Sequence, residues 1–248
     1  MKRILMPFSF LKVVLLVICL ISLSTFMFGT SIGYAQEADR VEALTKQIEL
    51  NPNSADLYFY RGVEYVQRDQ FELAVTDYTK AIELQPDDSV FYYLRAVAYY
   101  MLKKYDFAIN DCSIAIKLEP NNSLYFSERG HAEYKNNLFY RSIDDHSKAI
   151  ELNPNIYRYY DWRGNGYGCI GKYEEAIKDF KKAIQLNSKD AMVYFNLAQA
   201  YELTGEQELA VVNYQEALKL GVSDFPNKDQ AKIHSRLNGH WETCKEWI

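Results

Sequence analysis

The chain is poor in the residues that build loops, with 6 prolines and 11 glycines among 248 residues. Its 21 tyrosines and 13 phenylalanines instead supply abundant aromatic packing. The sequence also lacks a glycine-rich phosphate loop, a nucleophile elbow and a His-Glu-x-x-His motif, each of which marks a large class of enzymes. We therefore expect a helical, loop-poor protein that is not an enzyme and uses no cofactor.

Metal ligands are equally scarce. His240 and Cys244 are spaced one helical turn apart and could supply half of a metal site. A structural zinc site needs four ligands, and no second pair is visible. We therefore expect no metal.

Basic residues are in deficit over most of the chain. The first 35 residues contain Lys2, Arg3 and Lys12 and no acid, which leaves 25 bases against 33 acids, a net charge of −8, in the remainder. Nonspecific binding to nucleic acid requires a basic surface. The composition therefore argues against a nucleic-acid partner.

The N-terminus has the pattern of a targeting segment. The three bases precede an uncharged run at residues 13–28, and small and polar residues follow up to Ala35. This pattern predicts a secretory signal at residues 1–35, cleaved after Ala35. The alternative is an uncleaved membrane anchor, although an uncharged run of 16 residues falls short of the ~20 that a spanning helix needs. Either way we expect an exported protein, secreted or periplasmic, with membrane association only if the segment is retained.

Three cysteines remain beyond that segment: Cys112, Cys169 and Cys244. An odd number leaves at least one thiol unpaired within a monomer. A bridge between Cys169 and Cys244 stays open, because nothing in their spacing favours it.

Residues 55–224 contain one pattern five times at a period of 34 residues. In the first copy it consists of Tyr58, Gly62, Tyr65, Ala74, Tyr78, Ala81 and Pro86. A fixed period of this length is the signature of a solenoid. The predicted repeats are residues 55–88, 89–122, 123–156, 157–190 and 191–224.

Each repeat contains two segments in which apolar residues recur at helical spacing, separated by a short polar break. This pattern predicts two antiparallel helices. Small residues at Gly62, Gly130 and Gly164 are expected to face Ala74, Ser142 and Ala176 on the second helix. The prolines at 52, 86, 120 and 154 are expected to stop the second helices. Residues 36–54 read as a half-repeat that caps the start, and residues 225–248 as a capping helix with a tail.

On these residues and this period, the sequence resembles the tetratricopeptide repeat family. The resemblance implies an all-α, right-handed superhelical solenoid of antiparallel helix pairs. Three departures stand out: arginine where leucine is frequent, as at Arg61, Glu133 where tyrosine is usual, and His146 in place of a core aromatic.

In the family's geometry the first helices line a concave groove that binds a peptide or helix of a partner protein. The resemblance assigns the following residues to that groove here: Phe59, Val63, Tyr93, Val97, Tyr100, Leu124, His131, Tyr134 and Asn165. Counting from the start of the fourth repeat also places Asp161 in it. The first half of the set is apolar and aromatic, as partner sites often are. We therefore expect a noncatalytic scaffold with a protein or peptide partner.

A second interpretation is a structural subunit of a cell-envelope assembly. It would use the edges of the solenoid and the C-terminal tail, which contains Trp241 and Trp247.

One pairing can be inferred from the repeats alone. An aspartate follows each repeat arginine by 16 residues, from Arg61 and Asp77 to Arg163 and Asp179. In the fifth copy both charges are lost, at Leu197 and Asn213. We therefore predict an ion pair between the two helices of one repeat, partly exposed and worth ~0–1 kcal/mol.

Overall fold

The computed structural model describes residues 32–221 and Ile233. All regular structure in this part of the chain is α-helix. The helices form two compact units, which divide between Pro120 and Asn121. Each unit is described separately.

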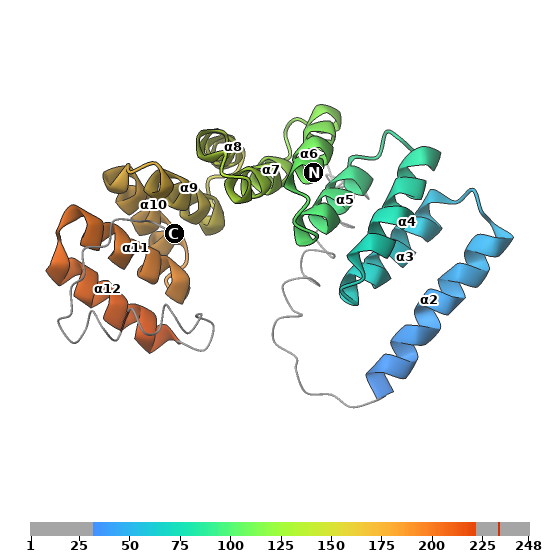
Figure 1. Cartoon of the computed structure of the whole chain (residues 1–248), viewed down its shortest axis with the longest axis horizontal. Helices are drawn as coiled ribbons and strands as arrows, with labels where there is room; N and C mark the ends of the chain where they lie inside the picture. Colours follow the sequence, from blue (N-terminus) through green and yellow to red (C-terminus); the bar gives the residue numbers. More distant parts are fainter. Residues whose placement is uncertain (1–31, 222–232, 234–248) are drawn as a thin grey trace, which may run out of the picture. The chain divides into compact units, whose positions relative to one another are not determined.

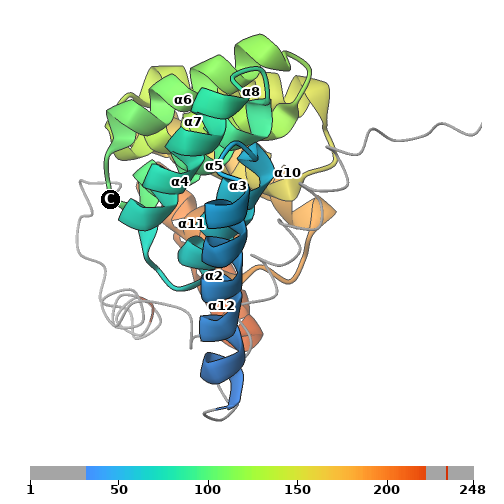
Figure 2. The same cartoon turned by 90° about the vertical axis from the view of Figure 1, so that its right-hand side faces the viewer.

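From residue 32 onward, where the structure describes it, unit 1 contains five helices, in which α2 is followed by two helix pairs (Figure 1). The helices are α2 (Ile32–Leu50), α3 (Ala55–Gln67), α4 (Phe71–Leu84), α5 (Ser89–Met101) and α6 (Tyr105–Leu118). Each packs mainly against its neighbours in sequence. Figure 2 shows α2 as the outermost helix of this unit, ahead of α3 and α4.

Unit 2 contains three helix pairs packed in the same sequential manner. They are α7 (Ser123–Lys135) with α8 (Phe139–Leu152), α9 (Tyr157–Cys169) with α10 (Tyr173–Leu186), and α11 (Ala191–Thr204) with α12 (Gln207–Leu220). The first helices α7, α9 and α11 also contact one another in turn. This sequential stacking is that of an all-α solenoid.

The turn inside each pair places one residue in the left-handed region. The residues are Asp69, Lys103, Asn137, Gly171 and Gly205, all at the same repeat position, with φ from 56° to 84°. Glycine adopts this conformation without strain and asparagine tolerates it, whereas Lys103 carries a cost of about 1 kcal/mol. The shared conformation gives every pair the same tight, antiparallel connection.

Packing between paired helices depends on small residues opposite rings. A Cβ added at Gly62 would lie 2.7 Å from the Tyr78 ring, and one at Gly164 would lie 2.7 Å from the Phe180 ring. The atoms nearest to such a Cβ belong to these rings and not to Ala74 or Ala176, the residues expected to face Gly62 and Gly164. The glycine accommodates the buried aromatic ring that lies 16 residues later.

His146 occupies this ring position in the third repeat. A Cβ added at Gly130 would lie 2.5 Å from its Cε1. His146 is fully buried, and its Nδ1 lies 2.7 Å from the carbonyl oxygen of Ser142. Burial, followed by the nearby His131, lowers its pKa to about 3, so the imidazole is neutral.

The predicted ion pairs are confirmed in four repeats. Each arginine donates through Nε and Nη2 to both carboxylate oxygens of its aspartate, at 2.7–2.9 Å. The pairs are partly exposed as predicted, but unevenly: the arginine side chains are 15–21 % exposed, whereas the aspartates are only 2–7 % exposed. Their energetics are those of buried pairs, in which desolvation rivals attraction.

Three of these arginines, Arg61, Arg95 and Arg163, also donate to the preceding helix pair or to α2 and lie between two rings. Arg163 Nη1 donates to Ser147 of the preceding repeat at 3.1 Å, and its guanidinium lies 5.8 and 5.9 Å from the Tyr160 and Tyr167 ring centroids. In the fifth repeat Leu197 replaces the arginine, and Lys181 lies over the Tyr201 ring at 5.3 Å instead.

In the third repeat one of the two rings beside the arginine is missing, because Glu133 stands at the position of Tyr167 in the fourth repeat. Its side chain is buried and pairs with Arg141 at 2.9 Å. Burial raises the pKa of Glu133 to about 7, and the nearby Asp145 adds to that rise.

The predicted signal or anchor at residues 1–35 lies largely outside the described residues, as do the tail tryptophans and Cys244. Of the predicted C-terminal cap, Ile233 is described: it is helical and fully buried in the core cluster formed with Tyr214 and Ala217. Among the described helices, none is both long and apolar enough to cross a membrane.

Candidate functional site

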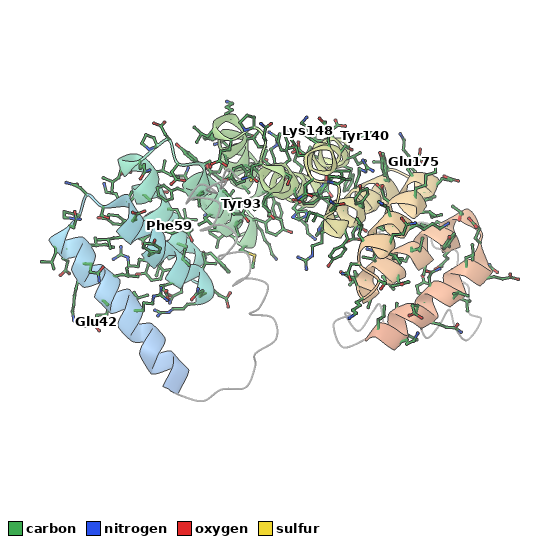
Figure 3. All side chains as sticks on the ribbon, turned by 180° about the vertical axis from the view of Figure 1, so that it is seen from behind. Glu42, Phe59, Tyr93, Tyr140, Lys148 and Glu175 are labelled. Atoms are coloured by element: carbon green, nitrogen blue, oxygen red, sulfur yellow. The ribbon has the colours of Figure 1, made fainter. Side chains whose placement is uncertain are left out.

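The predicted groove anchors of unit 1 belong mainly to the packing. Phe59 is 1 % exposed and Tyr93 is 4 % exposed, and Figure 3 labels both on the first helices of this unit. The Phe59 ring lies 5.5 Å from that of Phe91 on the next first helix. The expectation that Phe59 and Tyr93 present accessible anchor rings is therefore corrected, because their rings fill space between neighbouring helices. Val63, Val97 and Tyr100 are half-buried.

The predicted residues of unit 2 remain half-buried. Leu124, His131 and Tyr134 lie on α7, and Asn165 lies on α9. Unlike Phe59 and Tyr93, these side chains retain accessible surface, as Val63, Val97 and Tyr100 also do. We build the candidate site from the first helices of unit 2, because half-buried rings and polar side chains of neighbouring first helices contact one another there.

Aromatic rings form one part of this site. The Trp162 ring centroid lies 4.2 Å from that of His131 and 5.6 Å from that of Tyr134, so one indole from α9 contacts two rings from α7. Behind them, the His146 ring lies nearly parallel to Trp162 at 6.5 Å. His131, Tyr134 and Trp162 are hereafter the aromatic cluster.

The aromatic cluster contains polar atoms at its edge. His131 Nε2 is buried and has no hydrogen-bond partner among the described residues. The Cys169 thiol donates to the Tyr134 hydroxyl at 3.4 Å. Burial, and next the contact with Cys169, raises the pKa of Tyr134, so the phenol is protonated at physiological pH.

Polar side chains from α9 and α11 form the other part of the site. The carboxylate Oδ1 of Asp161 accepts from Asn165 Nδ2 at 3.4 Å and from Asn196 Nδ2 at 3.2 Å. Asp161 is half-buried and directly precedes Trp162 in sequence, and its charge also acts on Tyr134. Asp161, Asn165 and Asn196 are hereafter the polar cluster.

Burial dominates the ionisation of Asp161. It raises the pKa of this carboxyl to about 7; Asp190 adds to the rise, whereas Asn196, Arg158 and Asn165 oppose it. Arg158 Nε donates to the Tyr157 hydroxyl, which donates to Asp190 at 2.9 Å. Tyr157, Asp190 and Met192 also line an open pocket of about 300 Å³ together with Asn187, Lys189 and Leu220.

Sequence reasoning found most of this site. It placed His131, Tyr134, Asp161 and Asn165 in the groove, and the structure connects them through contacts between first helices. It missed Trp162 and Asn196 as site residues. The sixth position of the repeats is Tyr60, Leu94, Glu128, Trp162 and Asn196 in turn, so this position carries no periodic signal.

In the part of the chain that the structure describes, no three His, Cys, Asp or Glu side chains lie together in a way that could hold a metal ion. The pair His240 and Cys244 lies outside that part.

Comparison with known proteins bears on the fold. Family models described as TPR repeat match residues 62–103 and 170–205, and models described as tetratricopeptide repeat match 89–122 and 191–220. No curated protein matches the sequence.

Solved structures agree with those matches. The chain is similar to MamA, at 22 % identity over 69 % of this chain and 96 % of MamA, with a TM-score of 0.61. It is similar to YrrB, described as a TPR protein with an unusual peptide-binding site. The match has 23 % identity, covers 74 % of this chain and 95 % of YrrB, and has a TM-score of 0.61. It is also similar to TTC0263, a thermophilic TPR protein of Thermus thermophilus. That match has 18 % identity, covers 75 % of this chain and 100 % of TTC0263, and has a TM-score of 0.58. The chain is therefore a tetratricopeptide repeat protein.

Proposed function

We propose that this protein is a noncatalytic scaffold that binds a peptide segment of a partner protein on the first-helix face of unit 2. The carrying observation is that the aromatic cluster and the polar cluster meet on α9 at the consecutive residues Asp161 and Trp162, where the charge of Asp161 also acts on Tyr134. Half-buried rings offer large contact area at low entropic cost, and polar groups beside them fix the orientation of a bound chain. YrrB supports the proposal because that protein, of the same fold, is described by its peptide-binding site.

The test is binding by the full-length chain with one residue of the aromatic cluster removed. Panning a library of random peptides displayed on phage supplies the ligands, and isothermal titration measures their affinity. Because Trp162 contacts both other rings, Trp162→Ala should lower affinity by about tenfold or more.

Tyr140→Ala is the matched control, because Tyr140 is an aromatic residue of α8 and is 69 % exposed on the second-helix side of the same unit (Figure 3). Its removal should leave affinity unchanged. Trp162→Phe keeps a ring and separates loss of contact from loss of fold. Equal binding by Trp162→Ala and the wild type would refute the proposed face.

We further propose that the protein is exported. The support is the sequence pattern alone: three bases, an uncharged apolar run at residues 13–28, and small residues up to Ala35. Mass measurement of the mature protein tests this proposal. A chain that begins at Gln36 is expected, and an intact chain beginning at Met1 in the cytoplasmic fraction would contradict it.

A further inference from the structure

Position 5 of the repeat distinguishes the fourth copy. This position is Phe59, Tyr93, Ser127 and Phe195 in the other four repeats, and all four are buried. In the fourth repeat it is Asp161, an acid that keeps accessible surface. Packing therefore does not explain the residue, because the same position elsewhere is filled by a neutral side chain.

Asp161 also differs from the other inward-facing aspartates. Asp77, Asp111, Asp145 and Asp179 each accept two short hydrogen bonds from an arginine. Asp161 accepts only from two neutral amides at 3.2 and 3.4 Å, and among the described residues no cationic nitrogen lies within 4.0 Å of it. The charge of Arg158 acts on this carboxyl, but Arg158 Nε donates to the Tyr157 hydroxyl, so among the described residues the carboxylate is partly desolvated with no cation bonded directly to it.

The two asparagines add acceptors beside Asp161. Asn165 and Asn196 each donate one of their two side-chain N–H groups to Asp161, so each keeps a second N–H, and their carbonyl oxygens can still accept. A carboxylate and two amide oxygens together recognise a group with several N–H donors. Neither a carboxylate nor a phosphate meets this requirement, because both are acceptors and both are repelled by Asp161.

The aromatic cluster adds a second criterion. Trp162 follows Asp161 on α9, and the Asp161 charge reaches Tyr134. Ring faces attract cations, and the planar guanidinium of arginine stacks on them better than an ammonium does. The chain itself uses this chemistry, since Arg61 lies between the rings of Tyr58 and Tyr65 at 5.8 and 5.9 Å.

We propose that the polar cluster binds an arginine side chain of the partner peptide, with the guanidinium donating to Asp161 and lying beside the aromatic cluster. This inference rests on the proposed function, because it names the residue that anchors the peptide at that face. The guanidinium has five N–H donors in one plane, which suits the carboxylate and the two amide oxygens. Lysine fits less well, because it offers three donors and no planar face.

The experiment is a double-mutant cycle that combines a substitution in the peptide with a substitution at Asp161 in the protein. Peptides selected by panning on the full-length chain are resynthesised with each arginine replaced by citrulline, which is isosteric and neutral. We expect selected peptides to be enriched in arginine. At one position citrulline should weaken binding to the wild type by roughly ten- to a hundredfold, the range expected for hydrogen bonds to a charged group.

The same substitution should have little effect on binding to Asp161→Asn, which keeps the shape of the side chain and removes its charge. Asp144→Asn is the control, because Asp144 is an exposed acid on α8, and it should respond like the wild type. Circular dichroism establishes that the variants fold.

Each outcome decides between the two proposals. Selected peptides without a basic residue, or a citrulline penalty that is equal in wild type and Asp161→Asn, would overturn the arginine site and leave the peptide-binding scaffold standing. Failure of any peptide to bind would overturn both.

Discussion

The buried ion pairs between paired helices make a sharp prediction about stability. Arg163 donates to both oxygens of Asp179 at 2.7 and 2.8 Å, and the aspartate is 6 % exposed. Burial raises the pKa of Asp179 even with Arg163 beside it. The fifth repeat replaces the equivalent pair by Leu197 and Asn213 and keeps the same helix pair. We therefore choose the variants Arg163→Leu, Asp179→Asn and the double variant.

The expected magnitudes follow from the burial of each partner. Arg163→Leu leaves a buried carboxylate without a partner, which should cost about 3–5 kcal/mol of unfolding free energy. Asp179→Asn keeps a dipole beside a guanidinium that is 20 % exposed, and should cost about 1.5–3 kcal/mol. The double variant should lie within about 1 kcal/mol of wild type, because it removes both desolvation penalties. The coupling energy is therefore about 3 kcal/mol or more.

Urea unfolding of the full-length chain, followed by circular dichroism, measures the four stabilities. The control is the exposed pair of Lys148 and Glu151, which lie 2.8 Å apart on α8 and are 41 % and 69 % exposed. Its coupling should not exceed about 0.5 kcal/mol. Additive losses at Arg163 and Asp179 would refute the reasoning, because they would mean that the two groups do not compensate each other's burial.

Three further predictions test the core and the site. Replacing His146 by phenylalanine, the residue found at the equivalent Phe180, should give a gain in stability that grows to ~2 kcal/mol at pH 5. The pKa of His146 is about 3 in the folded protein, whereas the unfolded imidazole takes up a proton below ~6.5, so the wild type loses stability as the pH falls through that range. Urea titrations in which the variant gains equally at pH 7.5 and at pH 5 would contradict this. Binding of an arginine-containing peptide should weaken about 30-fold between pH 8 and pH 5.5, because only ionised Asp161 pairs with the guanidinium; a profile unchanged in Asp161→Asn would rule out that cause. Tyr93→Ala should lower stability by about 3 kcal/mol, as expected for a ring that is 4 % exposed; an unchanged melting curve with lost peptide binding would restore Tyr93 as a groove anchor.

The sequence alone predicted the helices well because the pattern occurs five times, and each copy constrains the others. Second helices end at Leu84, Leu118 and Leu152, two residues before each proline. In the later repeats, which lack that proline, the helices end at the equivalent Leu186 and Leu220. The end of the second helix is therefore set by packing as well as by proline.

The candidate site was harder to predict because it departs from the repeat. Periodicity identifies which residues lie on the first helices, but it does not tell whether a ring such as Phe59 is accessible or packed against its neighbour. Trp162 occurs in one copy only, so no periodic signal marks it, whereas counting repeat positions placed Asp161 in the groove without revealing its asparagine partners. The arginine and aspartate pairs were predictable for the opposite reason: four copies keep both charges and one copy loses both.

The central claim is that the first helices of unit 2 bind a partner peptide. Hydrogen exchange of the full-length chain with and without a panned peptide tests it most directly. We predict slowed exchange in α7, α9 and α11, and no such protection in Trp162→Ala at the same peptide concentration. Protection confined to α8, α10 and α12, or to unit 1, would contradict the claim.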